Sequence, residues 1–320
     1  MLDRIVQVAD GYDHEQLESD LQQLQAQYPL VHTEPIGVSV TGRKIWSVRI
    51  GDGPRRVHYN AACHANEWIT TPLLMTFLED YAQSINENAL LNERSGPELR
   101  QLTTLFAVPM ANPDGVELVQ HGAASFPSMG EQLLAWNGGC DAFSQWKSNI
   151  RGVDLNDQYP AGWEVERQRR AAGSDEAGAA GLLLPLAPAS TPGPRDYGGH
   201  APLTEPESVA LAAYTWLHRF DLVMSLHSQG REIYWNYRDY EPPEALELAE
   251  RLAAQSGYRA VKLSDSDAGY KDWFIQEFRR PGFTVEIGYG VNPLPIEQFQ
   301  ALYQEVLPIL EMGLFALDSK

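Results

Sequence analysis

The stretch Val57-His-Tyr-Asn-Ala-Ala62 runs directly into Cys63-His-Ala-Asn-Glu-Trp68, and an apolar-rich segment at 69–83 follows. The first part has the length and apolar character of a buried strand, whereas 69–83 repeats its apolar residues with helical spacing. A strand that leads through a short polar turn into a helix is the building unit of α/β proteins. The turn carries His64 and Glu67, and residues three apart on one helical turn point the same way. This stretch therefore predicts an α/β fold and a site at the end of its strand.

The same alternation of strand-like and helix-like segments continues along the chain. A polar hairpin is predicted between 34 and 50, and short apolar runs of strand length lie at 105–110, 222–226 and 283–287. Helical patterns occupy 15–28, 206–220, 243–256 and 296–318. Strands that alternate with helices indicate a largely parallel sheet with helices on both faces.

We expect a single catalytic domain over 1–320, because α/β enzymes of this length often form around one sheet. A helical lead-in is predicted over about 1–28. The stretch 167–202 is rich in Ala, Gly and Pro and has few large side chains to bury. Structureless stretches of this length are usually functional loops or disordered segments, so we expect a long surface loop there.

Charge and cysteine content narrow the classes of function. The formal net charge is −19 at pH 7, which disfavours nucleic acid or an anionic membrane as a partner. An anionic substrate remains allowed, since charges more than ~8–10 Å apart are largely screened at physiological salt. Cys63 and Cys140 permit one bridge at most, so no oxidising compartment is required. Without a signal-peptide pattern or an apolar run of about 20 residues, the predicted location is the cytoplasm, with no membrane association.

Two further polar residues belong to predicted strands. His227 comes directly after the run at 222–226, and Glu286 interrupts an otherwise apolar strand. Functional groups gather at the carboxyl ends of strands in α/β sheets, so both residues can meet His64 and Glu67. Two imidazoles and one carboxylate make a catalytic zinc site, and a buried carboxylate needs a partner or a role. The alternatives are a packing role for His227 and a structural ion pair for Glu286.

Five short sequence motifs follow one another along the chain in a characteristic order. They are Cys63-His-Ala-Asn-Glu-Trp-Ile-Thr, Asn112-Pro-Asp-Gly, Gly152-Val-Asp-Leu-Asn, Leu226-His-Ser and Thr284-Val-Glu-Ile. In this order they resemble the zinc metallocarboxypeptidase family typified by carboxypeptidase A, over about 32–303. The resemblance implies a mixed, mostly parallel sheet of roughly eight strands between helices. It also implies one zinc ion on His64, Glu67 and His227, with Glu286 as the general base that moves a proton from water to the leaving amine.

The resemblance further implies a cation and a second carboxylate at the site. In the family an arginine that follows the Asn-Pro-Asp-Gly segment stabilises the developing oxyanion. The matching region at 146–151 offers Arg151, with Lys147 as the poorer match. The alternative for Arg151 is a charge on a surface loop. Asp154 resembles the carboxylate that holds a ligand imidazole in the right tautomer, and a loop-capping role is its alternative.

The chain departs from ordinary carboxypeptidases at two substrate-binding positions. Those enzymes bind the terminal carboxylate with an Asn-Arg pair after Gly-Val-Asp, whereas this chain has Asn156-Asp157. An aspartate there would repel a carboxylate, which argues against simple exopeptidase activity. Lys271 matches the position that selects the side chain after the cut, where a lysine should accept a carboxylate; the alternative is a lysine that extends into solvent. Tyr270 is the nearest match to the mobile tyrosine of the family.

Together these departures resemble the bacterial γ-D-glutamyl-L-diamino acid endopeptidase I group, with 149–164 as the most similar run. Enzymes of this group cut between γ-D-glutamate and meso-diaminopimelate or lysine in cell-wall stem peptides. The carboxylate at the far end of diaminopimelate would give Lys271 a partner. A cell-wall stem peptide is therefore the predicted substrate.

Three other functions remain open from the sequence. A conventional carboxypeptidase would remove C-terminal residues from peptides. A zinc-dependent deacylase could use a similar metal set, although Asn112-Pro-Asp-Gly and Gly152-Val-Asp-Leu-Asn argue against it. A binding module without activity would have no use for Glu286 as a base.

Overall fold

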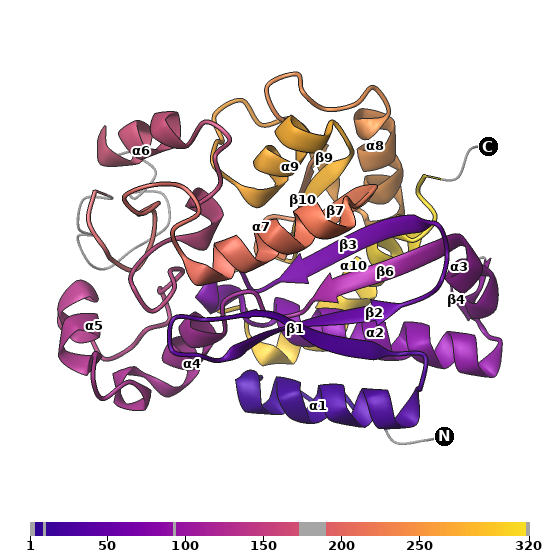
Figure 1. Cartoon of the computed structure of the whole chain (residues 1–320), viewed down its shortest axis with the longest axis horizontal. Helices are drawn as coiled ribbons and strands as arrows, with labels where there is room; N and C mark the ends of the chain where they lie inside the picture. Colours follow the sequence, from indigo (N-terminus) through magenta and orange to yellow (C-terminus); the bar gives the residue numbers. More distant parts are fainter. Residues whose placement is uncertain (1–3, 9–10, 92–93, 173–189, 318–320) are drawn as a thin grey trace.

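The computed structural model describes residues 4–8, 11–91, 94–172 and 190–317 (Figure 1). The strands are β1 (His32–Val38), β2 (Lys44–Ile50), β3 (Arg55–Ala61), β4 (Leu90–Leu91), β5 (Arg94–Ser95), β6 (Thr103–Val108), β7 (Leu222–His227), β8 (Glu232–Tyr234), β9 (Arg259–Val261) and β10 (Gly282–Glu286). The α-helices are α1 (His14–Gln27), α2 (Thr70–Glu87), α3 (Gly96–Leu102), α4 (Pro113–His121), α5 (Gly130–Trp136), α6 (Trp163–Ala172), α7 (Pro206–His218), α8 (Ala245–Ser256), α9 (Tyr270–Phe278) and α10 (Phe299–Gly313). Short 3₁₀ turns include η1 (Ala65–Glu67) and η3 (Leu155–Asp157). Within these described residues, no helix is both long and apolar enough to cross a membrane.

One mixed sheet organises the molecule. Its eight strands lie in the order β1-β2-β6-β3-β7-β10-β8-β9, and β4 with β5 forms a separate small ribbon. The four central strands β6, β3, β7 and β10 are parallel, and β8 pairs with β9 in parallel. The pairs β1-β2, β2-β6 and β10-β8 are antiparallel. The predicted mixed, mostly parallel sheet is therefore confirmed.

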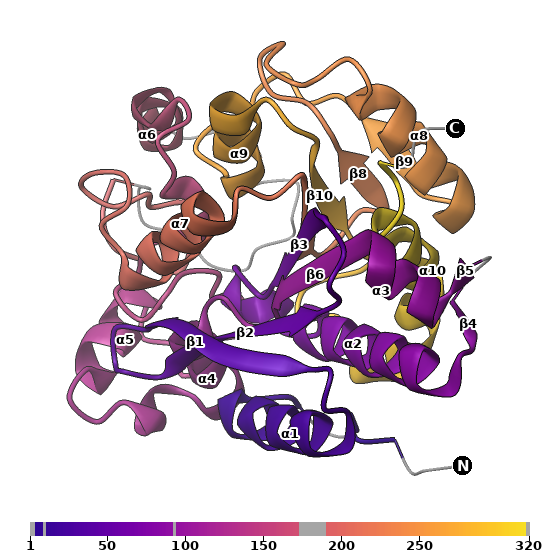
Figure 2. The same cartoon turned by 45° about the vertical axis from the view of Figure 1, so that its right-hand side comes forward.

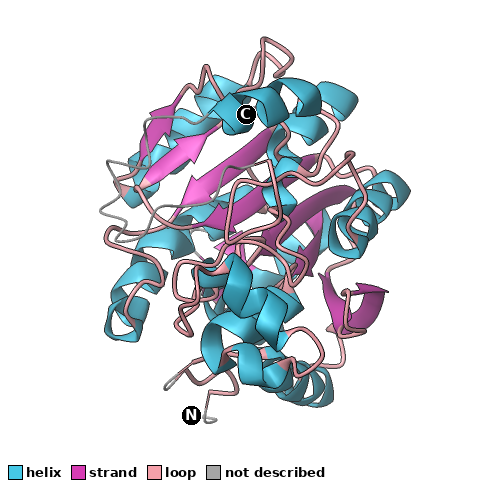
Figure 3. Cartoon of the chain, turned by 90° about the vertical axis from the view of Figure 1, so that its left-hand side faces the viewer, coloured by secondary structure: helices cyan, strands magenta, loops and turns pink. Residues whose placement is uncertain are grey.

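Helices cover both faces of this sheet (Figures 2 and 3). On one face α1, α2, α8 and α10 enclose the larger apolar core, which contains Phe77, Leu252 and Ile309. On the other face α7 and α9 enclose a second core with Leu211 and Phe274. Strands β6 and β7 are buried at every residue, as expected for parallel strands that are covered on both sides. The central strands therefore meet solvent only at their ends.

Two helices that the periodicity did not predict have clear local causes. Helix α4 begins at Pro113, directly after Asn112, whose side chain accepts a hydrogen bond from the Gly115 amide at 3.1 Å. An asparagine cap followed by proline is a strong helix-start signal. Helix α9 begins after Gly269, whose amide donates to the side chain of Asp272. Both helices are short, which is why an apolar period was hard to detect.

The stretch at 167–202, predicted as a surface loop, is helical at 167–172 and consists of turns and irregular backbone at 190–202. It begins inside α6, where Glu166 pairs with Arg170 at 2.7 Å and helical spacing stabilises the turn. Residues 173–189, which fall within that prediction, lie outside the described part of the chain. The part after 189 packs closely on the Gly-Val-Asp motif, because Gly152 has φ +69° and an added Cβ would lie 2.6 Å from the amide nitrogen of Gly193. The close approach of two backbones explains the glycine at 152.

Candidate metal centre and catalytic site

Parallel register brings four polar side chains, from three segments of the chain, to one edge of the sheet. In β7 and β10, His227 and Glu286 are direct neighbours across the ladder, and Ala61 of β3 pairs with Leu226. His64 follows β3 by a few residues and caps the η1 turn that carries Glu67. Because parallel strands end at the same edge, residues far apart in the sequence meet there. The sequence predicted this convergence.

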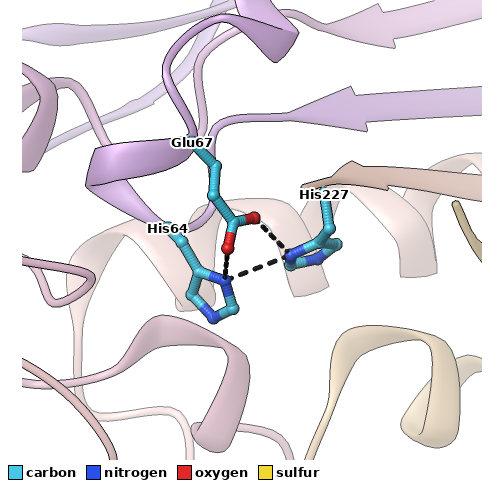
Figure 4. A group of neighbouring side chains, drawn as sticks. All are labelled: His64, Glu67 and His227. Carbon is cyan, nitrogen blue, oxygen red and sulfur yellow. Dashed lines mark hydrogen bonds and ion pairs between the residues drawn. The ribbon is translucent and has the colours of Figure 1, made fainter. Parts of the chain in front are cut away.

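His64, Glu67 and His227 form a buried cluster (Figure 4). The Glu67 carboxylate lies between the two rings, with Oε1 2.9 Å from Nδ1 of His64 and Oε2 3.0 Å from Nδ1 of His227. The two Nδ1 atoms are 3.2 Å apart. All donor atoms therefore point toward a common centre. Two ring nitrogens and a carboxylate are the donor set of catalytic zinc sites, so these residues fit a zinc ion.

The charges around the cluster stabilise one another. Burial would lower the pKa of His64, but the carboxylates of Glu67 and Asp154 outweigh it and raise this pKa to about 9. Burial would raise the pKa of Glu67, but His64, Lys147 and His227 hold it well below its usual value. Glu67 also accepts a hydrogen bond from the Ser228 amide at 3.2 Å, a contact that no sequence motif predicted. An ionised Glu67 is the form that a metal ligand needs.

Asp154 supports the cluster from behind His64. Its Oδ1 lies 3.3 Å from Nε2 of His64, on the side of the ring opposite to the ligand nitrogen. The same carboxylate accepts hydrogen bonds from the amides of Asn156 at 3.1 Å and Asp196 at 3.2 Å. Burial opposes its ionisation, yet His64 and nearby cations hold the pKa of Asp154 well below its usual value. A fixed carboxylate on the outer nitrogen sets the tautomer of a ligand imidazole.

Glu286 ends β10 next to this cluster and is partly exposed. Partial burial and the charge of Glu67 raise its pKa to about 8, against the opposing effects of Lys147 and His64. A carboxylate beside a metal site can take a proton from water and return it to a leaving group. The position of Glu286 is therefore compatible with the general-base role predicted for it.

In the described part of the chain, Lys147 is the cation that contacts the cluster. Its Nζ lies 3.6 Å from Oε1 of Glu67, and its side chain is 22% exposed. Arg151, the residue favoured from sequence, has a side chain that is 51% exposed, and its Nη1 lies 3.6 Å from Glu205. The chain turns between Lys147 and Arg151, so their side chains meet different partners. Lys147 follows Trp146, which is fully buried and anchors the segment.

Two predicted substrate-binding residues, Asn156 and Asp157, lie in the η3 turn. Oδ1 of Asn156 accepts a hydrogen bond from the amide of Tyr270 at 3.3 Å, which ties the turn to the start of α9. Asp157 is buried, and its Oδ2 lies 3.4 Å from Nε of Arg170 on α6. The carboxylate at position 157 therefore has a cationic partner within the protein.

The two remaining predicted residues, Tyr270 and Lys271, are both buried at the start of α9. The hydroxyl of Tyr270 lies 2.8 Å from that of Thr215 on α7, so its ring is held in the core between the sheet and the helices. Lys271 does not extend into solvent. Its Nζ donates to the carbonyl of Asn236 at 2.7 Å and to the carboxylate of Asp272. Asn236 and Asp272 line a surface cavity of about 440 Å³.

Comparison with known proteins agrees with this geometry. The family model described as zinc carboxypeptidase matches residues 17–307. The chain belongs to the zinc carboxypeptidase family. It is accordingly a metallopeptidase, a hydrolase with the fold of that family.

Individual members of the family resemble this chain over most of its length. Gamma-D-glutamyl-L-diamino acid endopeptidase 1 of Lysinibacillus sphaericus is 46% identical over 312 residues, which cover 98% of this chain and 74% of the relative. The uncharacterized protein YqgT of Bacillus subtilis is 38% identical, over 95% of this chain and 77% of the relative. Among solved structures, thrombin activatable fibrinolysis inhibitor aligns with a TM-score of 0.71 at 17% identity, covering 99% of this chain and 77% of that one. At this low identity the structural match establishes the fold alone.

Proposed function

We propose that this metallopeptidase hydrolyses the bond between γ-D-glutamate and meso-diaminopimelate, or another L-diamino acid, in cell-wall peptides. The relative from Lysinibacillus sphaericus, whose name describes that activity, supports the proposal with 46% identity. The main observation in its favour is the identity and pairing of the residue at position 157. Where a carboxypeptidase of this family has an arginine for the terminal carboxylate, this chain has a buried aspartate already paired with Arg170. A free α-carboxylate would find no new cation at this position.

Each residue has a role in the proposed reaction. His64, Glu67 and His227 would hold one zinc ion, which when bound lowers the pKa of a water molecule toward ~7 and polarises a carbonyl group. Glu286 accepts the proton of the attacking water and donates it to the leaving amine. Lys147 faces the same centre and stabilises negative charge on the carbonyl oxygen. Asp154 keeps His64 in its ligand orientation.

The pair formed by Lys271 and Asp272 supports the choice of a diamino acid. The far end of diaminopimelate carries both an ammonium and a carboxylate, whereas that of lysine carries the ammonium alone. Asp272 is at the wall of the cavity, with the Lys271 ammonium directly bonded to it. A paired carboxylate and ammonium are complementary to both groups of diaminopimelate. We therefore propose that this pair recognises the side chain of the residue after the cut.

Defined muropeptides test the proposal. The purified protein is incubated with peptides that contain γ-D-glutamyl-diaminopimelate and, separately, with α-linked peptides that have a free C-terminus. Mass spectrometry should show cleavage of the first set only, at the γ-D-glutamyl bond, with loss of activity on chelation and recovery with zinc. Release of C-terminal residues from the α-peptides, with the γ-linked set intact, would support the conventional carboxypeptidase instead. Cleavage that persists in chelator would contradict the proposed role of a metal ion.

A further inference from the structure

We propose that Arg170 is a positioning residue for the metal ligand His64, and that it acts by joining the two chain segments that hold Asp154. It lies on α6, and its ion pairs with residues of the described chain are with Asp157, Glu166 and Asp196, none of which is a predicted metal ligand. The proposal rests on the metal site of the proposed function. It adds a residue from outside the five motifs of the sequence.

The Asp154 carboxylate depends on two separate segments for its position. The η3 turn supplies one of them, because the amide of Asn156 donates to Oδ1 of Asp154. The segment around 195–197 supplies the other. There, the amide of Asp196 donates to Oδ2 of Asp154, and the amide of Asp154 donates to the carbonyl of Tyr197 at 2.8 Å. If these segments move apart, Asp154 loses the fixed position from which it orients His64.

Arg170 bridges these two segments with one guanidinium group. Its Nη1 lies 3.0 Å from Oδ1 of Asp196, and its Nε lies 3.4 Å from Oδ2 of Asp157 in the η3 turn. Nε is also 2.7 Å from Glu166, one helical turn earlier, which holds the arginine against α6. The guanidinium thus spans the two acids that flank Asp154 on either side. A planar fork with several donors holds both acids in a fixed geometry, whereas an ammonium group is a point charge on a flexible stem.

The same contacts explain how the chain tolerates an aspartate at position 157. Burial and the charges of Asp154, Glu166 and Asp196 raise the pKa of Asp157 to about 8, although Arg170 acts in the opposite direction. Asp157, Glu166 and Asp196 all contact Arg170, and Glu166 pairs with Arg169 as well. Arg170 lies on α6, where it stabilises the support of a metal ligand rather than a substrate carboxylate.

The test uses Arg170→Lys, which keeps the charge and removes the fork. Keeping the charge matters, because deleting a cation near a metal site would by itself favour binding of a dication. Arg169→Lys is the matched control. Arg169 has the same side-chain exposure of 31% and also binds two acids, Glu166 and Asp267, but it touches neither Asp157 nor Asp196.

Zinc affinity is measured for the full chain by competition with a chromophoric chelator, after circular dichroism has shown that each variant is folded. Loss of a direct partner of a metal ligand weakens binding by roughly 10–100-fold, and Arg170 acts one step further away. We expect Arg170→Lys to weaken zinc binding roughly three- to tenfold, and Arg169→Lys to change it by less than about twofold. Hydrogen exchange at the Asp196 amide, which donates to Asp154, should become faster in Arg170→Lys alone.

Each outcome decides for or against the inference. Unchanged zinc affinity and unchanged exchange in Arg170→Lys would overturn it. Equal losses in the two variants would also overturn it, since general anchoring of α6 would then explain both. If the unaltered protein binds no zinc, the proposed function fails first. If the unaltered protein binds zinc and only the Arg170 effect is missing, the proposed function is unaffected.

Discussion

Replacing Lys147 by methionine should remove most of the catalytic rate while leaving the metal in place. Its Nζ lies 3.6 Å from Glu67, and two unit charges at that distance interact by about 4–5 kcal/mol at an effective dielectric constant of about 20. Its side chain is 22% exposed, so solvent screening reduces the net contribution. Removal of one donor to a developing oxyanion lowers kcat by roughly 10²–10³-fold in other hydrolases. For a partly exposed ammonium we expect the lower end, about 100-fold.

The assay is steady-state hydrolysis of a γ-D-glutamyl-diaminopimelate peptide, with metal content measured for each variant. Zinc should bind to Lys147→Met at least as tightly as to the unaltered protein, because a positive charge beside the ligands has been removed. Lys147→Arg should keep most of the rate, since a guanidinium can replace the donor. Arg151→Met is the matched comparison and should change kcat by less than about threefold, because Arg151 is half exposed and paired with Glu205.

Two results would refute this reasoning. One is a Lys147→Met variant that keeps more than a third of kcat with normal metal content. The other is an Arg151→Met variant with a loss as large as that of Lys147→Met. The first result would exclude Lys147 from the oxyanion role, and the second would give Arg151, the residue favoured from sequence, an equal part in it.

Three further predictions concern the base, the specificity pair and a buried histidine. Glu286→Gln should bind zinc and substrate but lose about 10²–10⁴-fold in kcat; a rate within tenfold of the original would exclude it as the general base. Lys271→Met should reduce the preference for diaminopimelate over lysine in kcat/KM, measured on paired peptides, and an unchanged ratio would count against the Lys271–Asp272 pair. His58 is buried, and burial lowers its pKa to about 3. Between about pH 3 and pH 6.5 the unfolded chain binds a proton at His58, whose ordinary pKa is about 6.5, whereas the folded protein does not. The resulting stability is present above pH 6.5 and is lost as pH falls toward 3. When the pH is lowered from 7.5 to 5.0, the free energy of unfolding of His58→Phe should therefore fall by about 2 kcal/mol less than that of the unaltered protein. Urea unfolding in the presence of chelator measures both values. Parallel pH curves for the two proteins would contradict this.

The sequence alone determined the elements whose causes are local or periodic. Apolar runs of strand length identified β3, β6, β7 and β10, and the spacing of His64 and Glu67 placed both on one turn. Parallel strands end at a common edge whatever their separation in the chain. That rule predicts that His227 and Glu286 meet at one site, and the register of β7 and β10 makes them direct neighbours. Short helices such as α4 and α9 were not predicted, because the residues that start them are caps and do not form a periodic apolar pattern.

The tertiary structure decided where the remaining side chains point and which charges they meet. It placed Lys147 beside Glu67 and turned Arg151 toward Glu205, although only a few residues separate them in the sequence. It also paired Asp157 with Arg170, which no motif links to it. Ion pairs of this kind form between segments that packing brings together, so their partners are set by the whole fold. Spacing along the chain specifies neighbours within a turn or a strand, but it carries no information about which cation will lie against a buried carboxylate.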